Sequence, residues 1–245
     1  GHTLAVVAPQ REQSWIGAAK SRHRPVSSSV ADRAFGCPTW IVDGTPSDCV
    51  NIALAHLLPR TPDGRPAVTT ACPGPVEGVV SGINVGLNAS LGFILASGTI
   101  GGAWEGAVHG LPAMAFSQDL SVEAYDRLKS AGGQPTPDLL AILKISARRA
   151  ATLVPQLAAG TAPHSFTVHN VNFPFPCRPE TEIRRTVPAR VVVPGLFSPA
   201  QDDGTHRFVF QLGEDVSPPE PLTDRAALSA GQISHSVLDY RKLGQ

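Results

Sequence analysis

Neutral polar side chains and glycines are concentrated between Ser81 and Thr99. Asn84 and Asn88 place two carboxamides in a Gly-rich stretch, and Ser97-Gly98-Thr99 follows them. Small residues at the start of a helix leave backbone N–H groups without partners, at the positive end of the helix dipole. Such a helix start binds anions, phosphate above all. The pattern therefore indicates a phosphate site, although Ser and Gly before a helix are also common structural caps.

The elements around these residues predict one βαβ unit. Val79 and Val80 begin an apolar run that ends at Ser81-Gly82, a loop follows, a helix starts at Ser97, and a second apolar run covers Leu111–Phe116. The order strand, loop, helix, strand predicts a right-handed crossover. Because ligands collect at the carboxyl ends of the strands in such units, we expect the amides and the helix start to share one edge.

The same alternation extends over the first 160 residues. Thr3–Ala8 and Trp40–Val42 are strand-like, whereas Ser21–Arg33 is expected to be a surface loop. Helical patterns cover the ranges 49–58, 121–129 and 136–157. Asp48 suits the capping of the first of these helices, and a role in the site remains open. These patterns predict an α/β fold with three Rossmann-like layers: a mostly parallel sheet with helices on both faces.

The pattern changes to β after Ser165. The ranges 166–173, 182–193 and 206–212 are strand-like. Asp202-Asp203-Gly204 between two of them predicts a hairpin turn, and an acidic metal loop is the alternative. We therefore divide the chain into a Rossmann-like core, residues 1–160, and a β-rich carboxyl-terminal extension with an arm, residues 161–245.

Composition excludes several classes of function. Twenty basic and twenty acidic residues cancel, which gives no electrostatic basis for binding a nucleic-acid duplex or an anionic membrane. No apolar run approaches the roughly 20 residues of a membrane span, and the first residues do not resemble a signal peptide. Four cysteines without CxxC spacing favour reduced thiols in a cytoplasmic protein. P-loop and dinucleotide-binding motifs do not occur.

The string SGINVGLN, the following SGT and the segment GLPAMAFS together resemble the SurE family of 5'-nucleotidases, also described as survival-protein E phosphatases. Three further stretches agree in order and spacing: GHTLAVVAP with Ser14, GTPSDCV from Gly44, and NVNFP from Asn170. The tail TDRAALSAGQISHSVL is similar to the family's carboxyl-terminal element. The resemblance thus extends over nearly the whole chain.

This resemblance implies a metal-dependent phosphomonoesterase that acts on nucleoside 5'-monophosphates. It assigns Ser14 and Asn84 to a divalent metal ion, Mg²⁺ or Mn²⁺, and Ser97-Gly98-Thr99 with Asn88 to the phosphate. Without the resemblance, the sequence around Ser14 predicts only an ordinary solvated loop residue. The resemblance also implies a homodimer or homotetramer built through the β-rich arm.

The two adjacent aspartates that complete the family's metal site have no counterpart, because no Asp-Asp pair occurs before Asp202. Neutral Ser and Asn oxygens hold a divalent ion poorly without carboxylate charge. We therefore expect an amino-terminally truncated form with impaired metal binding and essentially no activity; no catalytic aspartate is assigned. The alternative is a non-catalytic relative that binds nucleotide or phosphate or serves as a scaffold. A serine hydrolase using Ser14 or Ser97 is disfavoured, since no G-x-S-x-G elbow occurs.

The sequence also departs from the family's pattern beside two of the assigned residues. Trp15 follows Ser14 where many members have Gly, and an aliphatic stretch lies between Asn88 and Ser97. Both departures leave the preferred substrate open.

Overall fold

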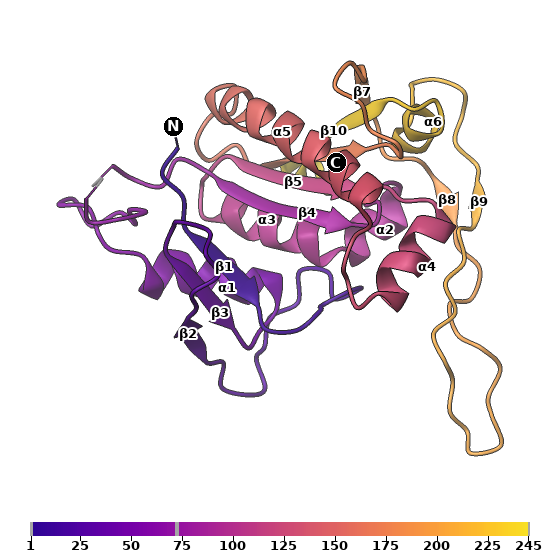
Figure 1. The fold of residues 1–245 in the computed structure, drawn as a ribbon, viewed down its shortest axis with the longest axis horizontal. Coiled ribbons are helices and arrows are strands. Elements are labelled where there is room, and N and C mark those ends of the chain that lie inside the picture. The colour runs from indigo at the N-terminus through magenta and orange to yellow at the C-terminus, as the bar shows by residue number, and fades with distance from the viewer. Residues whose placement is uncertain (1, 72–73, 245) are drawn as a thin grey trace.

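The computed structural model describes residues 2–71 and 74–244, and its central element is a five-stranded sheet in the order β4-β5-β6-β10-β7 (Figure 1). Strands β4 (Val79–Val85), β5 (Ala113–Gln118) and β6 (Thr167–Phe173) are mutually parallel. Strand β10 (Ile233–Asp239) is antiparallel to β6 and parallel to β7 (Ile183–Thr186). The sheet therefore crosses residue 160, and the division of the chain there stays a prediction.

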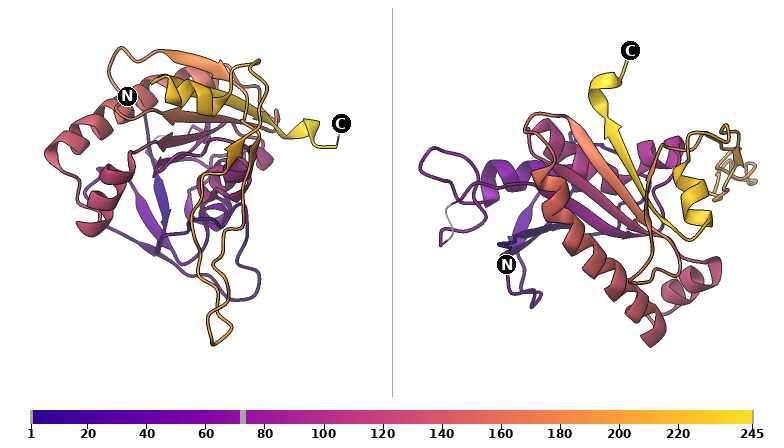
Figure 2. Two further views of the ribbon diagram at one scale, coloured as in Figure 1. Left: turned by 90° about the vertical axis from the view of Figure 1, so that its right-hand side faces the viewer. Right: turned by 90° about the horizontal axis from the view of Figure 1, so that it is seen from above.

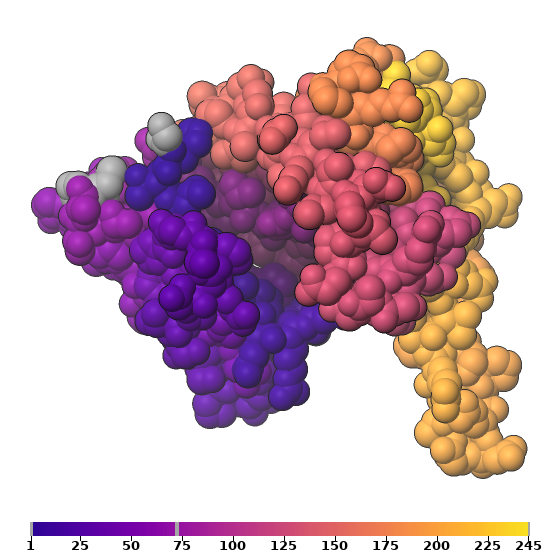
Figure 3. Space-filling model, viewed as in Figure 1, coloured from indigo at the N-terminus to yellow at the C-terminus, as the bar shows by residue number. Residues whose placement is uncertain are grey.

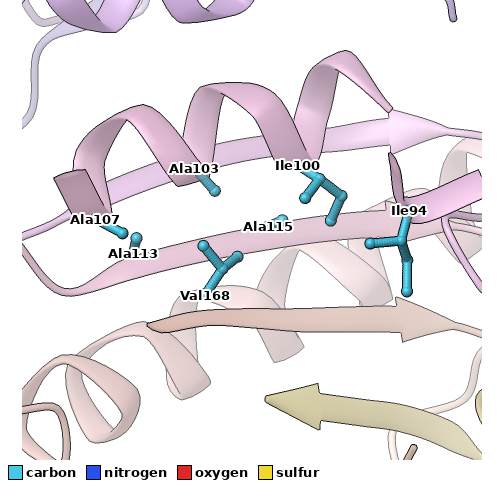
Figure 4. Packing of buried hydrophobic residues seen from close by; sticks show 7 residues of the cluster. All are labelled: Ile94, Ile100, Ala103, Ala107, Ala113, Ala115 and Val168. Atoms are coloured by element: carbon cyan, nitrogen blue, oxygen red, sulfur yellow. The ribbon is translucent and has the colours of Figure 1, made fainter. Parts of the chain in front are cut away.

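Helices cover both faces of this sheet, as the two further views show (Figure 2). On one face, α3 (Gly98–Val108) packs with Ile100, Ala103 and Ala107 against Ala113 and Ala115 of β5 (Figure 4). On the other face, α5 (Pro137–Ala159) covers an apolar cluster that includes Met114, Phe116, Val171, Phe173 and Ile233. The expected three-layer α/β fold with a mostly parallel sheet is confirmed.

The first strands form a separate sheet. Strand β1 (Val6–Pro9) pairs in parallel with β3 (Thr39–Val42), and β2 (Ser28–Val30) is antiparallel to β3. Helix α1 (Pro46–Ile52), which continues as the π-helix Ala53–Leu57, joins this sheet to α3. The space-filling view shows a hollow between these amino-terminal elements and the main sheet (Figure 3).

Some local expectations differ from the structure. Ser28–Val30, expected within a surface loop, forms β2, because its backbone completes the edge of β3. The stretch between Asn88 and Ser97 contains α2 (Leu91–Ala96), which buries Phe93 and Ile94. Residues 206–212 form no strand and contribute only a bridge between Phe197 and Phe208.

The remaining elements follow the expected pattern more closely. Asp202-Asp203-Gly204 is the expected turn, and it lies at the end of the arm, residues 194–213 (Figure 1). The other elements are α4 (Val122–Ser130), β8 (Val191–Val192), β9 (Glu214–Asp215), α6 (Asp224–Ser229) and a 3₁₀ turn (Tyr240–Lys242).

Within the described residues, no helix combines the length and apolar character needed to cross a membrane. Cys37, Cys49 and Cys177 are free thiols, and Cys72 lies outside the described residues. Burial raises the pKa of Cys49 to about 12, with a smaller contribution from Asp48, which makes Cys49 an inert core residue.

A histidine pair connects β6 to β10 on the α5 side of the sheet. His169 Nδ1 lies 2.9 Å from His235 Nε2, and His169 Nε2 lies 2.7 Å from Thr161 Oγ1. Burial lowers the pKa of both rings, to about 4 for His235, and the cation of Arg185 on the neighbouring strand adds to this. Both rings are therefore neutral at pH 7.

This pair should make stability depend on pH. In the unfolded chain histidine titrates near about 6.5, so between that value and about 4 the unfolded state binds more protons than the folded state. The contribution of this pair to the free energy of unfolding is therefore fully present above about pH 6.5, and it decreases as the pH drops towards 4. We expect His235→Gln to flatten this fall, measured as Tm against pH, whereas His23→Gln at an exposed position leaves it unchanged. Equal pH slopes in all three proteins would contradict this.

Candidate functional site

The contact between α3 and β4 sets the position of the candidate site. A Cβ on Gly106 would lie 2.6 Å from Val79 Cβ, and a Cβ on Gly102 would lie 3.0 Å from Ser81 Oγ. Four helical residues and two strand residues both advance about 6 Å, so one further step brings Gly98 level with the carboxyl end of β4. The amino terminus of α3 and Asn84 therefore lie at the same edge of the sheet.

Strand β4 is irregular at this edge. Its pairing with β5 shifts between Ser81 and Asn84, and Gly82 adopts φ +111° there. A Cβ on Gly82 would overlap the carbonyl oxygen of Phe116, so only glycine fits. Bulges of this kind redirect the side chains that follow them. This explains the glycine between Ser81 and Asn84.

The loop after β1 covers the start of α3. A Cβ on Gly98 would lie 3.1 Å from the Gln13 carbonyl oxygen and 3.0 Å from Ile16 Cγ2. The Gly17 N–H donates to the Ala96 carbonyl at 2.8 Å. Ser14 is exposed on this loop, and its hydroxyl donates to the carboxylate of Glu12. Ser14 is thus held beside the phosphate-binding segment expected from the sequence.

The Ser97-Gly98-Thr99 segment has the geometry of an anion-binding helix start. Ser97 is the N-cap of α3, and its hydroxyl accepts from the Ile100 N–H at 3.2 Å. The Gly98 and Thr99 N–H groups precede the hydrogen-bonded part of the helix, at the positive end of its dipole. Gly98 is buried, whereas Thr99 is partly exposed. These two N–H groups can therefore donate hydrogen bonds to an anion.

The two amides are bridged through β5. Asn84 is the pairing partner of Ser117, and its Nδ2 donates to the Gly86 carbonyl at 2.7 Å, so its amide oxygen is the atom that the predicted metal role would use. Asn88 Nδ2 donates to Ser117 Oγ at 2.7 Å. Asn88 is only 7% exposed, so its amide packs at the floor of this edge rather than on the surface.

Buried polar residues of the extension hold Asn88 in place. Asn172 Oδ1 accepts from the Asn88 N–H at 2.8 Å, and Asn170 Nδ2 donates to the Asn88 carbonyl at 2.8 Å. Asp224 accepts from the Ser90 N–H at 2.8 Å and the Ala189 N–H at 2.9 Å. Burial raises the pKa of Asp224 more strongly than these hydrogen bonds lower it. The extension therefore completes the floor of the site.

Charged groups fix the far end of the loop after β1. Lys20 Nζ lies 2.6 Å from Glu105 Oε2 on α3, and Glu105 Oε1 accepts from Asn51 at 2.9 Å. Asp48 caps α1 through Thr45 and also accepts from the Ser21 N–H at 3.2 Å. Burial would raise the pKa of Asp48, but hydrogen bonds from Ser21 and Thr45 outweigh it and keep that pKa below its usual value. Asp48 is thus a capping residue that anchors the loop.

The residues present do not fit a divalent metal ion. In the part of the chain that the structure describes, no group of three or more His, Cys, Asp or Glu side chains is arranged to hold one. At the candidate site Ser14 and Asn84 supply neutral oxygens, and the carboxylate of Glu12 is bonded to Ser14. A hard divalent cation needs more carboxylate charge than this.

Comparison with known proteins identifies the family. The family described as "Survival protein SurE" matches residues 1–193. The 5'-nucleotidase SurE of Trichormus variabilis is 33% identical over 257 residues, an alignment that covers 98% of this chain and 83% of that protein. The chain belongs to the SurE family. The corresponding protein of Gloeobacter violaceus is 32% identical, with 98% and 80% covered.

Two further matches differ in extent. The 5'-nucleotidase SurE of Desulforudis audaxviator is 43% identical over 116 residues, so the match covers 47% of this chain and only 39% of that protein. The crystal structure of the SurE protein from Aquifex aeolicus superposes with a TM-score of 0.60 at 25% identity, covering 95% of this chain and 81% of that one. The SurE fold therefore extends over nearly all of these residues.

The six residues predicted for the site come from the loop after β1, the end of β4, the segment that follows it and the start of α3, and their role in a site stays a prediction. The residues that support them were not predicted. The sequence did not indicate four buried residues as parts of the site: Ser117, Asn170, Asn172 and Asp224. Asn170 and Asn172 alternate within an apolar strand, which places both on one buried face. Two asparagines at alternate positions of an otherwise apolar strand were the sequence feature that could have indicated this buried network.

Close packing at Gly101 can be tested directly. A Cβ there would overlap the carbonyl oxygen of Gly17, so Gly101→Ala must push the Ser14 loop away from α3. We expect overpacking to outweigh the gain in helix propensity and cost about 1–3 kcal/mol, a fall of about 2–12 °C in Tm by thermal unfolding. Gly195→Ala, which has no atom within 4 Å, should leave Tm unchanged. An equal Tm for both variants would refute the contact.

Proposed function

We propose that this chain provides the phosphate-binding half of a phosphomonoesterase site for nucleoside 5'-monophosphates. The observation that carries the proposal is the pair of N–H groups of Gly98 and Thr99, at the start of α3, beside Asn84 and the Ser14 loop. Membership of the SurE family and relatives named 5'-nucleotidase support the reaction class.

The residues of this chain bind and orient the phosphoryl group. The N–H groups of Gly98 and Thr99 donate to its oxygens, and the helix dipole favours their negative charge. The buried network under Asn88 keeps the edge rigid, so little reorganisation is needed when charge develops during hydrolysis. These contacts place the phosphorus but do not activate the attacking water.

We further propose that this chain alone binds a divalent ion weakly and hydrolyses its substrate very slowly. Phosphoryl transfer requires neutralisation of the oxygens and a nucleophilic water, which Mg²⁺ or Mn²⁺ would supply when bound. Ser14 and Asn84 would be two of its ligands, and carboxylates must supply the remaining charge. A second candidate is a non-catalytic nucleotide-binding protein, favoured by the lack of a carboxylate cluster in the described ranges 2–71 and 74–244.

Phosphate release from a panel of nucleoside monophosphates tests both candidates. We expect the 245-residue chain to release almost no phosphate with Mg²⁺ or Mn²⁺. A chain extended at its amino end by a segment that carries the two adjacent aspartates implied by the family resemblance should become active and lose activity in EDTA. The same extension carrying Asn-Asn is the matched control and should stay inactive. Metal-dependent activity of the unextended chain would contradict the weak-binding proposal. Absence of phosphate release from every chain would favour the non-catalytic candidate.

We also propose that the arm mediates self-association into a dimer or tetramer. Large apolar side chains on and beside the arm are more than one third exposed: Val192, Phe197, Phe208, Val209, Phe210, Leu212 and Val216. Exposed apolar surface of this kind favours association between chains.

Light scattering after size-exclusion chromatography measures this association. We expect the unmodified chain to be a dimer or larger, and the double variant Phe197→Ser with Leu212→Ser to shift towards monomer because it removes apolar contact area. Val122→Ser, on the equally exposed surface of α4, should not change the mass. A monomeric unmodified chain, or identical masses for all variants, would count against the arm.

A further inference from the structure

Trp15 lies within a group of aromatic rings beside the candidate phosphate site. Its ring centroid is 5.4 Å from that of Phe93, 5.1 Å from Phe208 and 6.3 Å from Phe210. The four rings come from the loop after β1, from α2 and from the arm. Three segments distant in sequence therefore meet at this point.

The ring group is adjacent to the start of α3. Trp15 lies between Ser14 and Ile16, and Ile16 approaches Gly98 as closely as Gln13 does. Phe93 belongs to α2, which ends directly before Ser97. Trp15 also has φ +62°, a conformation that bulky residues rarely adopt. The surrounding contacts therefore hold the Trp15 backbone in a strained conformation.

Part of the Trp15 ring surface remains open. The indole plane of Trp15 makes angles of 62°, 59° and 67° with the ring planes of Phe93, Phe208 and Phe210. None of these three rings therefore stacks in parallel on the indole. The side chain is 39% exposed. A rigid, half-covered indole is a suitable surface for another flat aromatic group.

We propose that Trp15 is a stacking surface for the base of a bound nucleotide and favours purines, whose larger rings cover more of the indole. This inference rests on the proposed function, because it requires the 5'-phosphate at Gly98 and Thr99. One ribose separates the phosphate of a nucleotide from its base, and Trp15 directly precedes Ile16, whose side chain lies against Gly98. Stacking on an aromatic side chain tolerates different bases, so it sets a preference rather than an absolute choice.

Calorimetric titration of the chain with AMP, CMP and ribose 5-phosphate tests the proposal without requiring turnover. We expect AMP to bind about tenfold more tightly than ribose 5-phosphate, which lacks the base, with CMP between them. Trp15→Leu should lower AMP affinity to that of ribose 5-phosphate and leave ribose 5-phosphate itself unchanged. Trp15→Phe keeps an aromatic face and should retain most of the preference. AMP should quench tryptophan fluorescence in the unmodified chain and much less in Trp15→Phe.

Phe35→Leu is the matched control, since Phe35 is a 63% exposed aromatic residue that belongs neither to the ring group of Trp15 nor to the arm. It should leave all three affinities unchanged. Equal binding of AMP and ribose 5-phosphate to the unmodified chain would overturn the stacking role while the phosphate site stands. A parallel loss of both ligands in Trp15→Leu would show that Trp15 only anchors the arm. Failure of all three ligands to bind would overturn the proposed function, and this inference with it.

Discussion

The close approach of α3 to β4 and to the loop after β1 is the constraint on which the site depends. At Gly98, Gly101, Gly102 and Gly106 a side chain would meet neighbouring atoms at 3.1 Å or less. This spacing aligns the start of α3 with the carboxyl end of β4 and brings the Ser14 loop over both. A larger side chain at any of these positions would separate N–H donors from the polar residues opposite them.

A second layer of polar contacts makes this edge rigid from below. Asn88 is held by Ser117, Asn170 and Asn172, while Asp224 ties the following residues to the extension. Buried polar groups are costly unless they are paired, so a network with these partners stabilises one arrangement over others. The extension therefore contributes to the candidate site by holding Asn88 and Ser90 in place.

The arm connects two proposed properties of the molecule. Phe208 and Phe210 contact Trp15, and both remain about half exposed. Any partner chain that covers the arm would also change the surroundings of Trp15. Self-association and nucleotide preference would then be coupled through one set of rings, because both use the same exposed aromatic surface.

Local sequence determined the helix starts and the α/β class, and it indicated which segments would supply the candidate site. Ser97 and Thr136 are N-caps as their types indicate, and Ser97-Gly98-Thr99 predicts an anion site through backbone chemistry that needs no distant partner. Only the tertiary structure decided which residues support that site. The bonds of Asn88 to Asn170 and Asn172 span 82 and 84 residues, and β2 and α2 owe their form to β3 and to the burial of Phe93 and Ile94. Such contacts arise from the crossing of strands far apart in the chain, and no local pattern carries that information.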